Sequence, residues 1–329
     1  MFTLSRKMTL SVLAALLGFM MLALAACSGS STGLSSVSSN ALANTNLSSN
    51  AQSSYHFTTL NDQKDPTFNQ LLGINNSGVI AGYFGSGASA AHPNKGYRLN
   101  PPYTQNNYKN ENFPGSVQTQ VIAINNHGDT AGFWVDGNGV NFGFVRHNGV
   151  YTSYRDPNTG TGTVNQLLGL NDNGVAVGFY TDGKGVNHAY KLTLNDGHFK
   201  ELVPPGGTNA TATGVNNKGD IVGFFTASNG SIVSFLRTAN NKHYTEFDFP
   251  HSTNTTALGI NNFGQIVGAY VDGAKQMHGF LLSSGKWHSI DDPNGVGTTT
   301  INGLNDKGQL VGFYVDGAGN TDGFLANKR

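Results

Sequence analysis

The chain has 329 residues, of which 44 are glycine and only 12% are charged, and its formal net charge is zero. Its three Glu residues and the lack of any long helical-period run after the N-terminal segment exclude a mainly helical fold. Leaving out Arg6 and Lys7 of that segment, 17 basic residues stand against 19 acidic ones, without a basic stripe. Nucleic acid and an anionic membrane surface are therefore not expected as partners.

Residues 1–27 are typical of a secretory signal. Two basic residues precede an almost wholly apolar stretch over residues 8–26. Leu24-Ala25-Ala26-Cys27 resembles a bacterial lipobox, in which the cysteine is lipidated and becomes the mature N-terminus. Cys27 is the only cysteine, which excludes an intrachain disulfide, and Ser28 does not resemble an inner-membrane retention signal. We expect an exported protein, lipid-anchored at the outer membrane or cell surface. A plain signal peptide and an uncleaved single-span anchor are the alternatives.

Residues 28–54 form a Ser/Asn-rich segment with too little apolar content to build a core. As a coil, a tether of this length spans roughly 30 Å. The sequence thus predicts three parts, namely a signal over 1–27, a tether over 28–54 and a folded domain over 55–329.

The folded part repeats one phrase six times, Asn-Asn/Asp-x-Gly. Its first residue recurs at intervals of 50, 46, 45, 45 and 44, at Asn75, Asn125, Asn171, Asn216, Asn261 and Asn305. Within one unit, 257–293, four short apolar runs are separated by turn-forming residues. Four strands in each of about six 45-residue units predict an all-β, six-bladed β-propeller of four-stranded antiparallel blades. Five or seven blades are the alternatives.

The two ends of the folded part complement each other. The sixth unit stops at residues 324–326 without a fourth strand, whereas residues 55–60, before the first unit, resemble the strand that is missing. We expect this N-terminal strand to complete the last blade, because ring closure removes the open sheet edges that invite aggregation.

The repeated phrase lies between the first and second strands of each unit. Asn favours the first position of a type I turn, because its side chain can bond the backbone two residues on, and the final Gly can adopt a positive φ. A catalytic residue is needed once, whereas a turn is needed in every blade. The phrase is therefore predicted to be a turn.

The units resemble the HAF-type extracellular repeats of bacteria, named for a His-Ala-Phe-like motif in the third strand. The motif stands here as His188-Ala189-Tyr190 and His278-Gly279-Phe280, and the other four units lack the histidine. The resemblance covers roughly residues 55–329. It implies an exported, repeat-built protein and no particular activity.

The turns after the second strands contain the candidate binding residues. Asp136, Asp182, Asp272 and Asp316 each precede a glycine, and the aromatic residues Trp134, Tyr180, Tyr270 and Tyr314 come two residues before them. Asp-Gly is by itself a hairpin signal, and the aromatic residues can simply pack between blades. The functional interpretation is a ring of stacking faces near one mouth of the propeller, suited to sugars or aromatic peptides. Calcium is the rival interpretation of these aspartates, but each loop offers one carboxylate where the ion takes six to eight oxygen ligands.

Paired catalytic carboxylates, metal motifs and nucleotide-binding motifs do not stand out in the sequence. Glu201 and Glu246 fall at outer-strand positions, and the ten histidines are scattered. We therefore expect no catalytic residues, no bound metal and a monomer. The favoured function is a non-catalytic binding module for an extracellular glycan or protein, with the membrane contacted through the lipid anchor only. A structural spacer of the envelope surface and a polysaccharide-active hydrolase are the alternatives.

Overall fold

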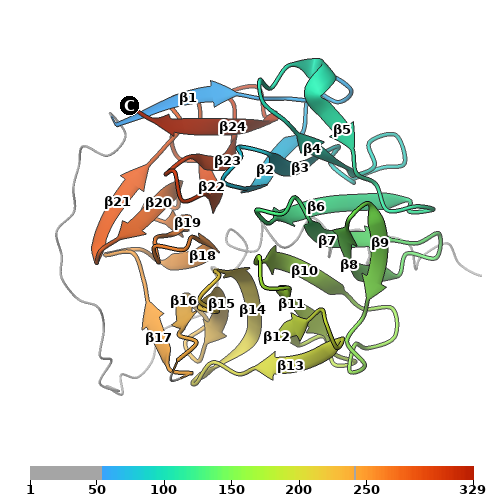
Figure 1. The fold of residues 1–329 in the computed structure, drawn as a ribbon. Coiled ribbons are helices and arrows are strands. Elements are labelled where there is room, and N and C mark those ends of the chain that lie inside the picture. The colour runs from blue at the N-terminus through green and yellow to red at the C-terminus, as the bar shows by residue number, and fades with distance from the viewer. Residues whose placement is uncertain (1–53, 241) are drawn as a thin grey trace, which may run out of the picture.

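In the computed structural model, which describes residues 54–240 and 242–329, six four-stranded antiparallel sheets form a ring around a central axis (Figure 1). The predicted six-bladed all-β propeller is confirmed. The predicted signal segment with Cys27, and the tether up to residue 53, lie outside the described residues. In the part of the chain that is described, no helix has the length and apolar character needed to cross a membrane.

The strands follow one another from the inner to the outer edge of each blade. The first three blades contain β2 (Asn69–Ile74), β3 (Ile80–Phe84), β4 (Lys95–Leu99), β5 (Tyr108–Asn110); β6 (Gln118–Ile124), β7 (Thr130–Val135), β8 (Asn141–His147), β9 (Val150–Tyr154); and β10 (Asn165–Leu170), β11 (Val175–Thr181), β12 (Asn187–Thr193), β13 (His198–Leu202). The last three contain β14 (Gly207–Val215), β15 (Ile221–Ala227), β16 (Ile232–Arg237), β17 (Tyr244–Phe247); β18 (Asn254–Ile260), β19 (Ile266–Val271), β20 (Met277–Ser283), β21 (Lys286–Ile290); and β22 (Thr300–Leu304), β23 (Leu310–Val315), β24 (Thr321–Lys328), β1 (Tyr55–Thr59). A short 3-10 helix, η2 (Gln105–Asn107), precedes β5.

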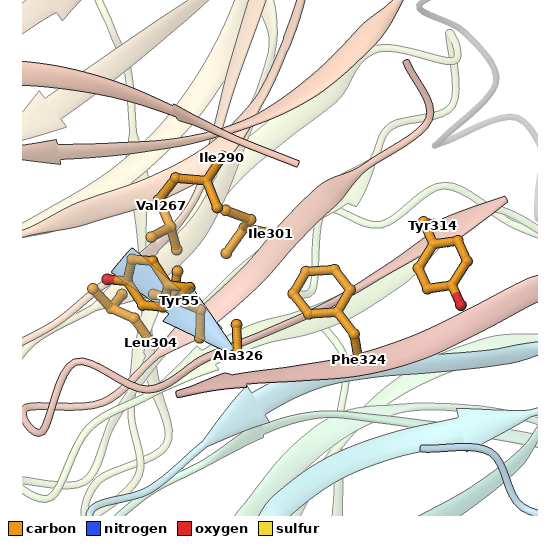
Figure 2. Packing of buried hydrophobic residues seen from close by; sticks show 9 residues of the cluster. Tyr55, Val267, Ile290, Ile301, Leu304, Tyr314, Phe324 and Ala326 are labelled. Atoms are coloured by element: carbon orange, nitrogen blue, oxygen red, sulfur yellow. The ribbon is translucent and has the colours of Figure 1, made fainter. Parts of the chain in front are cut away.

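The N-terminal strand completes the sixth blade, as predicted. β1 pairs with β24 from Tyr55 opposite Lys328 to Thr59 opposite Phe324, so the two ends of the described chain lie side by side (Figure 1). Figure 2 shows Tyr55 and Phe324 in a buried cluster that also draws residues from the fifth blade, among them Ile290. All six sheets are thus complete within the described residues, and burial of these side chains drives ring closure.

The innermost strands approach one another closely near the axis. Each has a β-bulge just before a small residue, and these residues are Gly73, Ala123, Gly169, Gly214, Gly259 and Gly303. A Cβ on Gly303 would lie 2.6 Å from the carbonyl oxygen of Leu72 in the next blade, and one on Gly259 would lie 2.9 Å from that of Asn302. Glycine is used here because a neighbouring backbone occupies the space of a side chain.

The Asn-Asn/Asp-x-Gly phrase forms the turn between the first two strands, which confirms the prediction. In the first blade Asn75 Oδ1 accepts hydrogen bonds from the backbone N–H of Ser77 and Val79, each 3.0 Å long. Gly78 has a φ of +78°, in the left-handed region that glycine adopts at no steric cost. The other five blades repeat this arrangement.

The same asparagines join the blades into a closed ring. Each first Asn donates through Nδ2 to the backbone carbonyl of the equivalent Asn in the next blade, over 2.9 to 3.3 Å, and Asn305 donates to Asn75. A second ring lies beside it, because the next residue of each turn donates its backbone N–H to the side-chain oxygen of its counterpart. The turn residues thus also hold the ring of blades together.

Two acidic residues occupy opposite places in the second ring. Asp172 in the third blade accepts hydrogen bonds from the side chains of Asn126 and Asn217, and Asp306 in the sixth accepts them from Asn76 and Asn262. Although burial opposes ionisation of both groups, these amide hydrogen bonds leave the pKa of Asp172 and of Asp306 below its ordinary value. Both carboxylates are therefore charged acceptors of the ring.

Candidate functional site

The aspartates after the second strands fix the backbone of their own turns. Asp136 Oδ1 accepts hydrogen bonds from the N–H groups of Asn138 and Val140, 2.9 and 2.8 Å long, and the other three aspartates repeat the pattern. The left-handed residue of the first turn is Gly139, not the Gly137 that follows the aspartate. These hairpins are therefore longer than a two-residue Asp-Gly turn, and one oxygen of each aspartate is already engaged.

Trp134 and Tyr270 are packed between other aromatic rings. Trp134 stacks on Phe113, with centroids 4.3 Å apart and planes 2° apart, and on Phe142 at 4.8 Å. Tyr270 stacks on Phe249 at 3.7 Å and 3°. Phe113 and Phe249 belong to the loops that enter these blades, so the stacks join loop to sheet. The ligand-binding role of these two rings remains a prediction.

Tyr180 and Tyr314 are more deeply buried, at 4% and 3% exposure. Their blades have Asp156 and Asp292 in the entering loop where the other two blades have phenylalanine. In the sixth blade the loop backbone covers the ring, because a Cβ on Gly295 would lie 2.2 Å from Tyr314 Cβ. These two rings therefore offer a ligand little more than their edges, and their predicted role likewise remains a prediction.

Three of these four aromatic residues are hydrogen-bonded through their polar tip to the outer strand of their own blade. Trp134 Nε1 donates to Ser153 Oγ over 3.0 Å, the Tyr270 hydroxyl is hydrogen-bonded to Ser289 at 2.9 Å, and that of Tyr314 to Thr59 at 3.0 Å. In the third blade the register places Glu201 at the equivalent position. Among the described residues, the structure gives the Tyr180 hydroxyl no such partner.

Glu201 is instead joined to a histidine. His188 Nδ1 lies 2.7 Å from Glu201 Oε1, and His188 Nε2 lies 3.3 Å from Asp182 Oδ2. The imidazole also stacks on the Tyr180 ring at 4.9 Å and 10°. Because Glu201 and Asp182 contact its two nitrogens and Tyr180 covers one face of its ring, His188 is fixed in place and in turn fixes the Glu201 carboxylate.

The fifth blade repeats this arrangement around its own motif histidine. His278 lies 2.7 Å from Asp291 and 3.5 Å from Asp272, and it stacks on Tyr270. The two histidines that the sequence analysis singled out thus share one structural role, which is to connect the hairpin aspartate to a carboxylate near the outer strand.

A groove of about 480 Å³ lies along the outer strand of the third blade. It is lined by Asp156, Pro157, Asn158, Tyr180, Asp196, Gly197, His198, Phe199 and Glu201. Its walls therefore combine three carboxylates, an amide, an imidazole and two aromatic side chains, with no Lys or Arg. Polar groups of this kind beside apolar rings are typical of small-molecule sites.

The electrostatics of this groove favour ligands that donate hydrogen bonds over ligands with a negative charge. Burial, and then the carboxylates of Glu201, Asp156 and Asp182, raise the pKa of Tyr180 to about 12. The Tyr180 hydroxyl therefore stays protonated and can donate a hydrogen bond, while the three carboxylates of the groove accept them. A ligand rich in hydroxyl or amino groups fits this arrangement.

Of the predicted site residues, Tyr180 lines the groove, and Asp182 is connected to it only through the contact of His188 with Glu201. The remaining six belong to other blades, namely Trp134, Tyr270, Tyr314, Asp136, Asp272 and Asp316. Sequence reasoning placed Glu201 at the outer edge and left it out of the site. Aligning the repeats would have drawn attention to it, because the third and fourth blades have an acid, Glu201 and Glu246, at this position. Three other blades have Ser153, Ser289 and Thr59 there. Within the described ranges, no group of three or more His, Cys, Asp or Glu side chains is placed to hold a metal.

Comparisons of the whole chain agree on the fold. A scan against protein-family models and a search of curated proteins found no match. Among solved structures, the chain is similar to a putative TolB from Agrobacterium tumefaciens, with 11% identity and a TM-score of 0.56 over 82% of this chain and 97% of that one. It is also similar to a mutant of AofleA from Arthrobotrys oligospora in which arginines are replaced by alanine, with 12% identity and a TM-score of 0.51 over 83% and 86%.

A fungal lectin from Aleuria aurantia, a six-bladed β-propeller, matches with 11% identity and a TM-score of 0.47 over 78% of this chain and 90% of its own. At such identities the first two likenesses, with TM-scores above 0.5, show the fold alone. Fold and groove together define the chain as a six-bladed β-propeller with a polar groove on its third blade.

Proposed function

We propose that the protein is an exported, lipid-anchored propeller that binds an extracellular glycan without catalysis, through the groove on the third blade. One observation carries the proposal. Glu201, which His188 holds in place, and Tyr180 line the same groove, and the Tyr180 hydroxyl has no hydrogen-bond partner among the described residues. Sugars offer several hydroxyl groups, and a fixed carboxylate accepts from them without the entropic cost of being ordered on binding.

The charge of the groove narrows the ligand class. Asp156, Asp196 and Glu201 line it without a compensating Lys or Arg, so a sialylated, uronic or sulfated glycan would bring its charge against three carboxylates. The expected ligand is a neutral glycan or one that carries free amino groups.

Export and anchoring are supported by the sequence of residues 1–27 and its lipobox-like cysteine, Cys27. The assignment to HAF-type repeats is supported by the shared placement of His188 and His278 between two carboxylates. Electrophoretic mobility and mass of the mature protein, compared with a Cys27→Ala variant, test the lipid anchor.

A glycan array tests the binding function. The probe is the chain from Ser54 onward, whose six sheets are complete without the preceding residues. Saturable binding to neutral or aminated glycans is expected. Glu201→Gln should weaken it about tenfold or more, because the acceptor loses the charge that strengthens its hydrogen bond. The matched control is Glu246→Gln, since Glu246 holds the equivalent register position in the fourth blade, opposite Phe235.

The array is run with and without calcium, which separates direct recognition from recognition through an ion. Equal binding by wild type and Glu201→Gln would reject this groove as the site. A folded protein that binds no glycan in either condition would favour the spacer function instead.

A further inference from the structure

A second groove, of about 420 Å³, lies where the ring closes between the sixth and first blades. Its lining is Ser77, Gly78, Pro101, Tyr103, Lys307, Gln309, Asn327 and Lys328. The charged side chains in this lining are two lysines, whereas the groove on the third blade has three carboxylates. The two grooves are therefore suited to ligands of opposite charge.

The walls of the second groove are held in place. Gln309 Nε2 donates to Asn327 Oδ1 over 2.8 Å, and Gln309 Oε1 accepts from Asn305 over 2.7 Å. Tyr103 has a φ of +65°, a strained conformation for a bulky residue, and its hydroxyl donates to the Gly78 carbonyl over 2.9 Å. This hydrogen bond fixes the Tyr103 side chain against the turn of the first blade.

Both lysines are available for a ligand. Neither Lys307 nor Lys328 takes part in an ion pair among the described residues. The carboxylate next to Lys307 in the sequence, Asp306, accepts from the amides of Asn76 and Asn262 and does not line the groove. Lys286 and Lys328 both contribute, after burial, to lowering the pKa of the nearby His288, so the surroundings are electropositive.

The groove opens on the less acidic face of the propeller. The turns between strands one and two and between strands three and four lie on its face. On the opposite face, the loops carry eleven carboxylates against the cations Lys64, Arg155, Lys184 and Lys275. These carboxylates are Asp62, Asp65, Glu111, Asp136, Asp156, Asp182, Asp248, Asp272, Asp291, Asp292 and Asp316. The turns on the groove's own face carry Asp129, Asp172, Asp196, Asp220 and Asp306 against Lys218, Lys242 and Lys307, a smaller acidic excess. An anion is therefore repelled less on the face where the groove opens.

We infer that this groove binds a phosphate group between Lys307 and Lys328. Phosphate is the anion shared by phospholipid headgroups and free phosphate compounds, and two ammonium groups are its ordinary partners. The chain enters the propeller beside the groove, since Arg329 N–H donates to the Ser54 carbonyl over 2.8 Å and Tyr55 pairs with Lys328. If Cys27 is lipidated, the tether joins the propeller on this face, so a headgroup is one source of phosphate although the sequence has no basic stripe.

Two binding assays on the chain from Ser54 onward distinguish these sources. Inorganic phosphate is titrated while NMR shifts of the groove residues are followed. Separately, the protein is sedimented with vesicles of phosphatidylcholine alone or mixed with phosphatidylglycerol. Saturable phosphate binding, or sedimentation with the anionic vesicles only, is expected. Either should weaken about tenfold or more in the Lys307→Ala/Lys328→Ala variant and fall with added salt.

Lys218→Ala is the matched control. Lys218 holds the same place as Lys307 in the turn of the fourth blade, where its N–H donates to Asn216 Oδ1, but it lies outside the groove. Retained binding in this variant supports the groove as the site. The inference is overturned if neither probe binds, or if Lys218→Ala weakens binding as much as the double variant does. The glycan array involves the other groove, so the two proposals can fail independently.

Discussion

The side-chain amide of Asn305 in the sixth blade donates a hydrogen bond over 3.0 Å to the backbone carbonyl of Asn75 in the first, 230 positions away in the sequence. This bond closes the ring of six asparagine contacts around the axis. The ends of the ring are thus joined twice, by this bond near the axis and by the pairing of β1 with β24 at the outer edge.

Replacing Asn305 with Ala should destabilise the propeller by about 2–4 kcal/mol. The change removes the contact to Asn75 and the acceptor for the N–H groups of Lys307 and Gln309, at a site only 3% exposed. Urea unfolding followed by tryptophan fluorescence measures the loss. Asn138→Ala, at an exposed hairpin position, is the control and should stay within about 0.5 kcal/mol of wild type. Equal stabilities of the two variants would contradict a structural role for the ring.

Replacing Gly303 with Ala should cost about 1–3 kcal/mol, because the added methyl group would meet the Leu72 carbonyl of the first blade at 2.6 Å. The thermal midpoint of unfolding measures this. Gly317→Ala serves as the control, since a Cβ there meets nothing within 4 Å. If Gly303→Ala were as stable as the control, the close approach of the inner strands would not account for glycine at this position.

Trp134→Ala should lower the free energy of unfolding by about 2–4 kcal/mol, because its ring is half-buried and stacked between Phe113 and Phe142. Glycan binding at the third blade should be unchanged, because Trp134 does not line that groove. Denaturant unfolding and the glycan array are measured on the same preparation. The reverse result, with stability kept and binding lost, would support the ligand-binding role predicted from the sequence.

Asp292→Asn should stabilise the protein at neutral pH. Asp292 is fully buried, its Oδ2 has no hydrogen-bond partner among the described residues, and burial raises the pKa of its carboxyl. The folded state therefore binds this proton more tightly than the unfolded state. Ionisation of Asp292 therefore destabilises the folded state. This loss of stability is absent below the pKa that Asp292 has in the unfolded chain, grows as pH rises to its higher pKa in the folded state, and is constant above that.

Unfolding at a series of pH values from acid to neutral compares wild type with Asp292→Asn, whose gain in stability should grow with pH through that window. Asp316→Asn is the contrasting variant. Backbone hydrogen bonds from its turn, Asn320 N–H first, lower the pKa of Asp316, so its contribution is present at neutral pH and lost as pH falls. Parallel profiles for Asp292→Asn and wild type would reject an uncompensated charge at Asp292.

The blade count, the turns and the closing strand were predictable from the sequence because each depends on local chemistry repeated six times. A turn needs its Asn and Gly within four residues, and four apolar runs in a 45-residue period leave few architectures. Closure of the ring was also predictable, since residues 55–60 resemble the outer strand that the last unit lacks. The repetition also showed correctly that the phrase is structural.

The groove on the third blade was decided by tertiary structure. It depends on Glu201 lying beside His188 and near the Tyr180 hydroxyl, and on the loop that enters from the second blade supplying Asp156. Tertiary structure also decided that Phe113 stacks on Trp134 and that Lys307 and Lys328 line one groove. Local sequence determines how each segment folds, whereas side chains from separate segments and blades meet only when sheet register, blade order and ring closure place them together. The sequence by itself therefore determined the ring of blades, and the packing of blade against blade decided where a ligand can bind.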